Sequence, residues 1–152
     1  MAFVNPYIRR ALGSNPVIIE RLVDQLPDSA FDARPDPERF TLREVLCHLA
    51  DWEPFFLERL KGAATVDNFR ITVYDEGQMA IDNDYAHQDP RDALKRYKSG
   101  RDAYLAYAAS LPPEALDRPA YHPEQGKLTA GDLINIVVGH DVYHIDQISA
   151  ML

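Results

Sequence analysis

The feature that most constrains this chain is a set of four amphipathic stretches with helical periodicity, separated by segments without it. Apolar residues recur in them at three- and four-residue spacing, as one face of an α-helix requires. The predicted helices span about 5–26, 41–62, 90–111 and 129–151. We find no competing strand-hairpin signal. The 152 residues suit one domain, 1–152. The pattern predicts an all-α four-helix bundle with long connections between helices 2 and 3 and between helices 3 and 4.

Two of the predicted helices begin with a recognisable capping box. Thr41-x-x-Glu44 precedes the second helix, and Thr129-x-x-Asp132 precedes the fourth. In such a motif the hydroxyl and the carboxylate each satisfy a backbone N–H group that the helix leaves without a partner. These motifs fix where the two helices start.

Prolines interrupt the first two predicted helices. Pro16, together with Gly13, predicts a kink in the first helix or a second start within it. Pro54 predicts a bend near Ala50 in the second helix, because it removes one backbone hydrogen bond. We expect this helix to stop at Gly62.

Charge and cysteine content exclude several classes of function. Lys and Arg total 16 and Asp and Glu total 24, which gives a net charge of −8. A surface of this sign repels phosphate backbones and anionic lipids, so nucleic acid and membranes are poor partners. The single cysteine, Cys47, excludes an intrachain disulfide, and we interpret it as a small apolar packing residue. No apolar run approaches the roughly 18 residues of a membrane span. The N-terminus lacks the order of a secretory signal, so we expect a cytoplasmic protein.

Two histidines occupy the apolar stripe of the last predicted helix. His140 and His144 lie one turn apart, so their rings can converge on one point. Buried imidazole nitrogens need partners, and a divalent metal would satisfy both rings at once. A pair of core histidines bonded to nearby side chains or carbonyls is the alternative.

His48 lies on the shoulder of the apolar stripe of the second helix and is the candidate third ligand. Three neutral nitrogen ligands would leave a coordination position for water or substrate, which is typical of a catalytic site. His87 and His122 fall in the irregular connections. There they are either solvated or placed to carry protons at a pocket mouth.

Side chains next to these histidines are weaker candidates for catalysis. Asp51, Asp141 and Glu44 could act as general bases or accept a hydrogen bond from an imidazole N–H, although surface acids at these positions would look the same. Gln147 could orient a ligand or a water molecule. The aromatic residues that could line a pocket are Trp52, Tyr74 and Tyr143.

Three segments resemble a known family. They are NPYIRRAL at the start, FTLREVLCHLADWE in the second helix and TAGDLINIVVGHDVYHIDQI in the last. The chain resembles the DinB-like superfamily, including the YfiT-type metal-dependent hydrolases, over nearly its whole length. The resemblance implies a four-helix bundle, commonly a homodimer, with a divalent metal, often nickel or zinc, bound by His48, His140 and His144.

The resemblance does not select one reaction. Relatives include transferases and isomerases that use low-molecular-weight thiols such as bacillithiol or mycothiol. The first hypothesis is therefore a metal-dependent enzyme that hydrolyses a small molecule or transfers such a thiol to it. The second is a metal-binding or stress-related protein without turnover, and the third is a metal-free helical interaction module. Three imidazoles suit zinc, nickel, copper and iron alike, so the residues leave the metal open, and nickel or zinc is what the resemblance implies.

Overall fold

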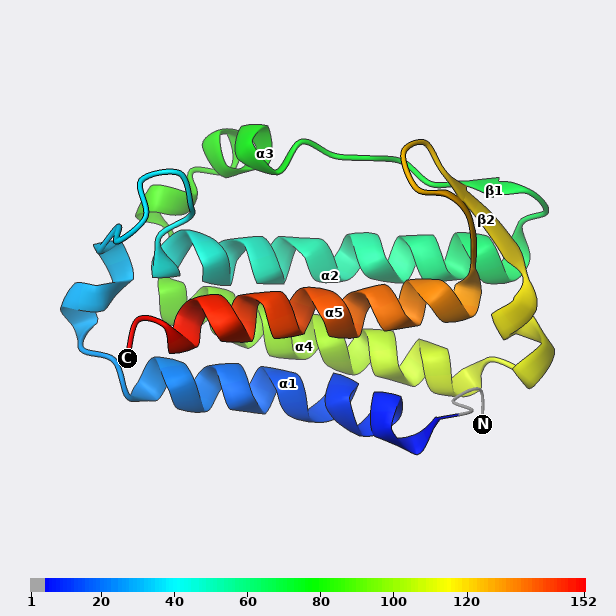
Figure 1. Ribbon diagram of the computed structural model, residues 1–152, viewed down its shortest axis with the longest axis horizontal. Coiled ribbons are helices and arrows are strands. Elements are labelled where there is room, and N and C mark those ends of the chain that lie inside the picture. The colour runs from blue at the N-terminus through cyan, green and yellow to red at the C-terminus, as the bar shows by residue number, and fades with distance from the viewer. Residues whose placement is uncertain (1–4) are drawn as a thin grey trace.

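Four long helices run side by side and form the body of the molecule, as the ribbon diagram in Figure 1 shows. The computed structural model describes residues 5–152. The bundle consists of α1 (Pro6–Asp24), α2 (Leu42–Thr65), α4 (Pro90–Ser110) and α5 (Ala130–Ser149). Helix α2 packs most extensively against α4, and α1 packs most extensively against α5. The predicted four-helix bundle is confirmed. None of the helices in residues 5–152 combines the length and apolarity that a membrane span requires.

Both predicted capping boxes are present. The Thr41 hydroxyl accepts a hydrogen bond from the Glu44 backbone, and the Glu44 carboxylate accepts one from the Thr41 backbone. Thr129 and Asp132 form the same reciprocal pair at the start of α5. The starts of α2 and α5 are therefore set by local sequence, and these two helices carry the three histidines.

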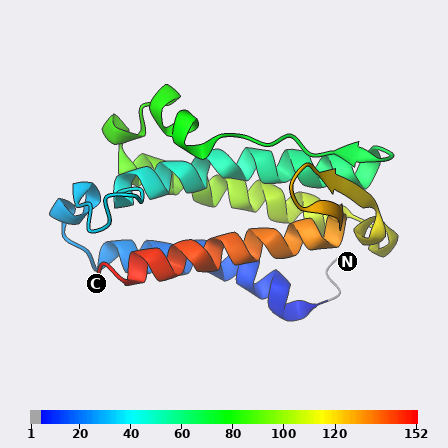
Figure 2. The ribbon, with the colours of Figure 1, turned by 45° about the horizontal axis from the view of Figure 1, so that its top comes forward.

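The prolines do not break the helices. Helix α1 runs through Pro16, and its ribbon bends in its N-terminal third (Figures 1 and 2). Helix α2 runs through Pro54 and ends at Thr65, three residues beyond the predicted stop at Gly62. Gly62 has a packing role instead, because a Cβ atom there would overlap the ring of Phe69. The glycine lets the chain after α2 fold back closely onto the helix.

The two long connections meet in a small sheet at one end of the bundle. Between α2 and α4 lie β1 (Phe69–Arg70), α3 (Glu76–Asp82) and a 3-10 turn, η2 (Tyr85–His87). Another 3-10 turn, η1 (Asp28–Asp32), joins α1 to α2. Between α4 and α5 lie η3 (Pro113–Asp117), β2 (Pro119–His122) and β3 (Gly126–Thr129). Strand β2 pairs in parallel with β1, with Phe69 opposite Ala120, and antiparallel with β3.

The β2–β3 hairpin is absent from the sequence prediction. The strands are four residues each, and their sequences, PAYH and GKLT, show no alternation of apolar and polar residues. Gly126 adopts a φ of 78°, a left-handed conformation that glycine reaches without steric cost. The hairpin therefore depends on one turn residue and on pairing with β1, which a scan for alternation does not detect.

The core is divided into two apolar clusters that follow one another along the bundle. One contains Leu12, Phe56 and Tyr104 together with Val137. The other contains buried residues from the opposite half of the same helices, among them Ile19, Leu46, Tyr97 and Ile148. Buried polar side chains occupy the intervening positions on the helices. This polar layer contains the candidate site.

Candidate metal centre

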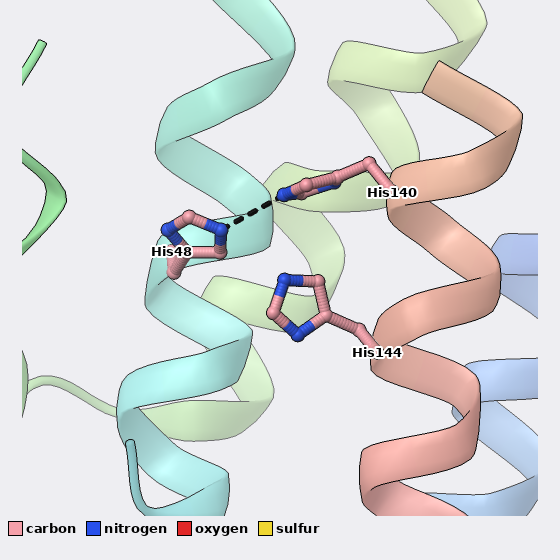
Figure 3. A group of neighbouring side chains, drawn as sticks. All are labelled: His48, His140 and His144. Atoms are coloured by element: carbon pink, nitrogen blue, oxygen red, sulfur yellow. Dashed lines mark hydrogen bonds between the residues drawn. The ribbon is translucent and has the colours of Figure 1, made fainter. Parts of the chain in front are cut away.

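Three imidazole rings meet in the polar layer, one from α2 and two from α5. His48 projects from α2, and His140 and His144 project from successive turns of α5 (Figure 3). Their candidate ligand atoms all lie within 4.8 Å of one another. The Nε2 atoms of His48 and His140 are 2.9 Å apart, and a ring nitrogen of His144 points toward both (Figure 3). We call these residues the histidine cluster.

Burial keeps the histidine cluster uncharged. Loss of hydration, together with a smaller effect of the neighbouring His144, lowers the pKa of His48 to about 3. Burial also lowers the pKa of His140 far below its usual range. The pKa of His144 is lowered by the same cause, although its hydrogen bond to Gln147 opposes the shift. Neutral imidazole is the form that binds a metal, so the cluster is in its ligand form at neutral pH.

Gln147 fixes the orientation of His144. The His144 Nδ1 lies 3.0 Å from the Gln147 side-chain oxygen. An amide oxygen only accepts, so Nδ1 carries the proton and donates it, and Nε2 keeps its lone pair. The Gln147 amide nitrogen in turn donates to the Phe40 carbonyl. Gln147 therefore fixes the ring orientation of His144, a candidate ligand.

The protein itself leaves the histidine cluster short of partners. At most one proton can lie between the two Nε2 atoms of His48 and His140. The Nδ1 atoms of both residues are buried without a hydrogen-bond partner. One imidazole cannot bring both of its nitrogens to the same ion, so an ion between the rings would engage the converging Nε2 atoms and not these Nδ1 atoms. Nitrogens this close can share one ion, because zinc–nitrogen bonds measure about 2.0–2.1 Å. The donor set therefore fits a divalent metal.

Asp141 lies in the same layer but belongs to a different cluster. Its carboxylate accepts hydrogen bonds from Arg101 (2.7 and 2.8 Å), Tyr97 (2.9 Å) and Asn15 (3.1 Å). Arg101 also donates to Glu53, at 2.6 and 3.1 Å. We call these five residues the ion cluster. They connect all four helices of the bundle, so Asp141 holds α5 in register and makes no hydrogen bond to an imidazole.

The other two acidic candidates are also engaged away from the histidine cluster. The Asp51 carboxylate accepts hydrogen bonds from Asn83 (2.9 Å), Tyr85 (2.9 Å) and Arg96 (3.1 Å). Asp51 therefore fastens the connection between α2 and α4. Glu44 completes the capping box of α2.

Cys47 and the two loop histidines have separate surroundings. Cys47 is buried, and burial raises the pKa of its thiol to about 11, which keeps it protonated and inert. His87 is exposed and pairs with Asp84 at 2.6 Å. The His122 Nδ1 accepts hydrogen bonds from the backbone N–H groups of Glu124 and the next residue, which fixes its ring at the β2–β3 turn.

Two cavities reach the histidine cluster from different sides. The first, of about 260 Å³, touches His140 and also has His122 in its wall. The second, of about 270 Å³, touches His144. Trp52 and Tyr74 line the first and Tyr143 lines the second, so all three aromatic candidates have pocket positions.

Sequence reasoning missed five charged residues of these walls. They are Arg59 and Glu124 in the first cavity, Glu38 and Arg39 in the second, and Glu76, which lines both. Arg59 follows Trp52 by seven residues, two helical turns, so it lies on the same face of α2. This spacing from Trp52 could have identified Arg59 as a wall residue from the sequence alone. Arg39 lies in an irregular segment, and Glu76 begins the short helix α3, which the sequence pattern does not predict, so no helical period gives either position.

The fold and the cluster together define a class of protein: a helical bundle with a three-histidine centre of metal-binding type at the floor of two cavities. The model of the DinB superfamily matches residues 12–148. The chain therefore belongs to the DinB superfamily, and the resemblance found in its sequence motifs is confirmed.

Two curated relatives cover most of the chain. A protein of Oceanobacillus iheyensis, named "Putative metal-dependent hydrolase OB0782", is 28% identical over 136 residues, which are 90% of this chain and 78% of that protein. "Putative metal-dependent hydrolase YfiT" of Bacillus subtilis is 26% identical over 137 residues, 90% of this chain and 77% of its own length.

A solved structure shares the whole fold. It is described as "YfiT from Bacillus subtilis is a probable metal-dependent hydrolase with an unusual four-helix bundle topology". Its TM-score is 0.88 with 23% sequence identity, and the match covers 99% of this chain and 89% of that one. At this identity the likeness concerns the fold.

Proposed function

We propose that this protein is a metal-dependent enzyme that acts on a small molecule. His48, His140 and His144 would hold one divalent ion, nickel or zinc, and leave a coordination position open for water or substrate. The observation that carries the proposal is the convergence of three neutral imidazoles, two buried and one half-buried, whose candidate ligand atoms lie within 4.8 Å of one another. The names of the two curated relatives support the same class of activity.

The surroundings of the histidine cluster favour catalysis over a purely structural metal site. A structural ion is usually closed by four protein ligands, whereas a catalytic one keeps three and an open position. Among residues 5–152, the group of metal-ligating side chains at this point contains three members. Both cavities end at this group, so a small molecule has a route to it from either side.

A bound divalent ion would supply a Lewis acid beside which water or a thiol gives up its proton more readily. The residues of this chain do the positioning. Gln147 holds His144 in the tautomer that presents Nε2. Trp52 and Tyr74 shape the cavity on the His140 side. We propose hydrolysis or transfer of a low-molecular-weight thiol as the reaction, and a homodimer as the working assembly.

Metal analysis of the purified full-length protein tests the proposal. We expect about one equivalent of nickel or zinc per chain in the wild type and none in His48→Ala, with His87→Ala as the control that removes an exposed histidine. X-ray absorption of the loaded protein should show three imidazole nitrogens and at least one further light ligand. A protein that binds no transition metal, or one that keeps it in His48→Ala, contradicts the proposal.

A further inference from the structure

Two arginines on the walls of the cavities form no ion pair with any residue in 5–152. Among the described residues, the arginines that are buried or half-buried are Arg39, Arg43, Arg59, Arg101 and Arg118. Three of them form ion pairs, Arg43 with Asp32, Arg101 with Glu53 and Asp141, and Arg118 with Asp67. Arg39 and Arg59 form none, and each lines one of the two cavities that reach the histidine cluster.

This distribution is unexpected for an acidic chain. Acidic residues outnumber Lys and Arg by 24 to 16, so carboxylate partners are plentiful. A partly buried guanidinium loses hydration and normally recovers the cost through a carboxylate. Burial lowers the pKa of Arg59, and the neighbouring Tyr74 and Glu58 oppose that shift without forming an ion pair. An unpaired guanidinium in a cavity wall therefore marks a place where the missing carboxylate can come from a ligand.

The guanidinium of Arg59 is held in place with donors to spare. Its Nη2 donates to the Thr72 carbonyl at 2.9 Å, and the group lies 5.0 Å from the centre of the Trp52 ring. These contacts orient the guanidinium. Its Nε is buried without a partner. No hydrogen bond is made by Nη1. A carboxylate is the natural partner for two neighbouring N–H groups of one guanidinium.

The remaining wall of this cavity limits the ligand further. Trp52, Phe56 and Tyr74 supply aromatic surface, and Val73 and Ile136 supply aliphatic surface. Glu76 and Glu124 also line it, so a polyanion such as a nucleoside triphosphate would meet like charges there. A volume of about 260 Å³ suits a small molecule.

We propose that the cavity on the His140 side is a binding site for a small organic monocarboxylate, recognised by Arg59 through its carboxylate and by Trp52 and its aromatic neighbours through its apolar body. This names a substrate class for the proposed function and rests on it for the chemistry. The ligand would lie with its carboxylate on Arg59 and its other end toward His140.

The fluorescence of Trp52 offers a direct test, because Trp52 is the only tryptophan of the chain and lies against Arg59. The full-length protein, as purified and again after metal removal with its helicity checked, is titrated with phenylacetate, with its neutral isostere phenylacetamide and with inorganic phosphate. We expect saturable binding of phenylacetate in both states, and affinities at least about tenfold weaker for the amide and for phosphate. A tenfold loss is the size expected when a charge-assisted hydrogen bond is lost.

Variants that each remove one arginine charge distinguish a direct contact with Arg59 from a general effect of positive charge on binding. Arg59→Gln should weaken phenylacetate binding at least about tenfold. Arg70→Gln removes the same charge from an exposed arginine outside the cavity, and Arg39→Gln removes it from the other cavity, so both should keep wild-type affinity.

Several outcomes would overturn the proposal. They are equal affinity for the acid and the amide, preference for phosphate, wild-type affinity in Arg59→Gln, or no saturable binding of phenylacetate. If Arg59→Gln does not fold, the comparison of acid with amide in the wild type still decides. Metal content is measured on the same samples. A metal-free protein with Arg59-dependent binding would refute the proposed function and leave the carboxylate site standing.

Discussion

The ion cluster and the histidine cluster lie in one polar layer, between the same two apolar clusters, yet they meet the cost of burial differently. In the ion cluster every guanidinium nitrogen of Arg101 donates a hydrogen bond within the protein. In the histidine cluster two ring nitrogens have no partner. A completed network stabilises the fold by itself, whereas converging nitrogens of neutral imidazoles are the arrangement that binds a metal ion. The difference distinguishes a cluster that connects the four helices from one whose geometry is compatible with metal binding.

The ion cluster also shows how an excess of negative charge is accommodated in a core. Two carboxylates, Glu53 and Asp141, face one guanidinium. Burial raises the pKa of Glu53, and the charge of Arg101 opposes that shift. Asn15 and Tyr97 supply neutral donors to Asp141. The cluster therefore relies on hydrogen bonds as well as on the charge pair.

The largest expected effect comes from breaking the ion cluster. Arg101→Met leaves two buried carboxylates unpaired, which costs about 3–5 kcal/mol in the free energy of unfolding. Denaturant unfolding followed by circular dichroism measures this. Arg91→Met, which removes an exposed partner of Asp24, should cost about 1 kcal/mol or less. Equal losses in the two variants would contradict a structural role for the ion cluster.

Metal binding at the histidine cluster should stabilise the protein almost as much as Arg101→Met destabilises it. At a free metal concentration a thousandfold above the dissociation constant, nickel or zinc adds about 4 kcal/mol. Thermal unfolding with and without metal shows this as a higher melting temperature. His144→Ala should remove the gain. A wild-type melting temperature that neither metal raises would contradict a metal-binding role for the histidine cluster.

A pH titration of the metal-free protein sharpens the contrast. The pKa values of the histidine cluster are lowered in the folded state, so below about pH 6.5 the unfolded chain binds protons that the folded one does not. Stability is therefore present above that pH and is lost as pH falls toward 3. The expected slope is about 1.4 kcal/mol per pH unit for each histidine that protonates on unfolding. His48→Gln should flatten the dependence of the free energy of unfolding on pH between pH 6.5 and 5. An unchanged slope would show that protonation of His48 on unfolding does not cause it.

The smallest expected effect concerns the hydrogen bond between His144 of the histidine cluster and Gln147. Gln147→Ala removes the acceptor of the His144 Nδ1 proton, and we expect metal affinity to fall by about tenfold to a hundredfold. Competition with a chelator measures the change. Gln147→Glu keeps an acceptor and should retain most of the affinity. Loss of affinity in the glutamate variant, or none in the alanine variant, would show that orientation of His144 is not the reason for it.

Much of the fold can be predicted from the sequence because it depends on local sequence patterns. Apolar spacing locates the bundle helices, and Thr41 and Thr129 mark two helix starts. The histidine cluster follows from the position of His140 and His144 in the apolar stripe of α5. The hairpin at Gly126 and the cavity walls do not follow, because they depend on pairing with β1 and on irregular segments. The sequence suggests Asp141 as a partner of the imidazoles, because it follows His140 directly. Adjacent residues of a helix point in different directions, so Asp141 belongs to the ion cluster instead.

Helix α3 has no buried residue, although the connection that carries it is anchored on both sides. Ile71 and Tyr85, on either side of α3, are both buried, while Glu76 and Val73 between them reach the cavities. Mutations in this stretch can therefore alter what the site accepts without disturbing the bundle or the histidines. Over evolutionary time such a scaffold can exchange one substrate for another while keeping its reactive centre intact.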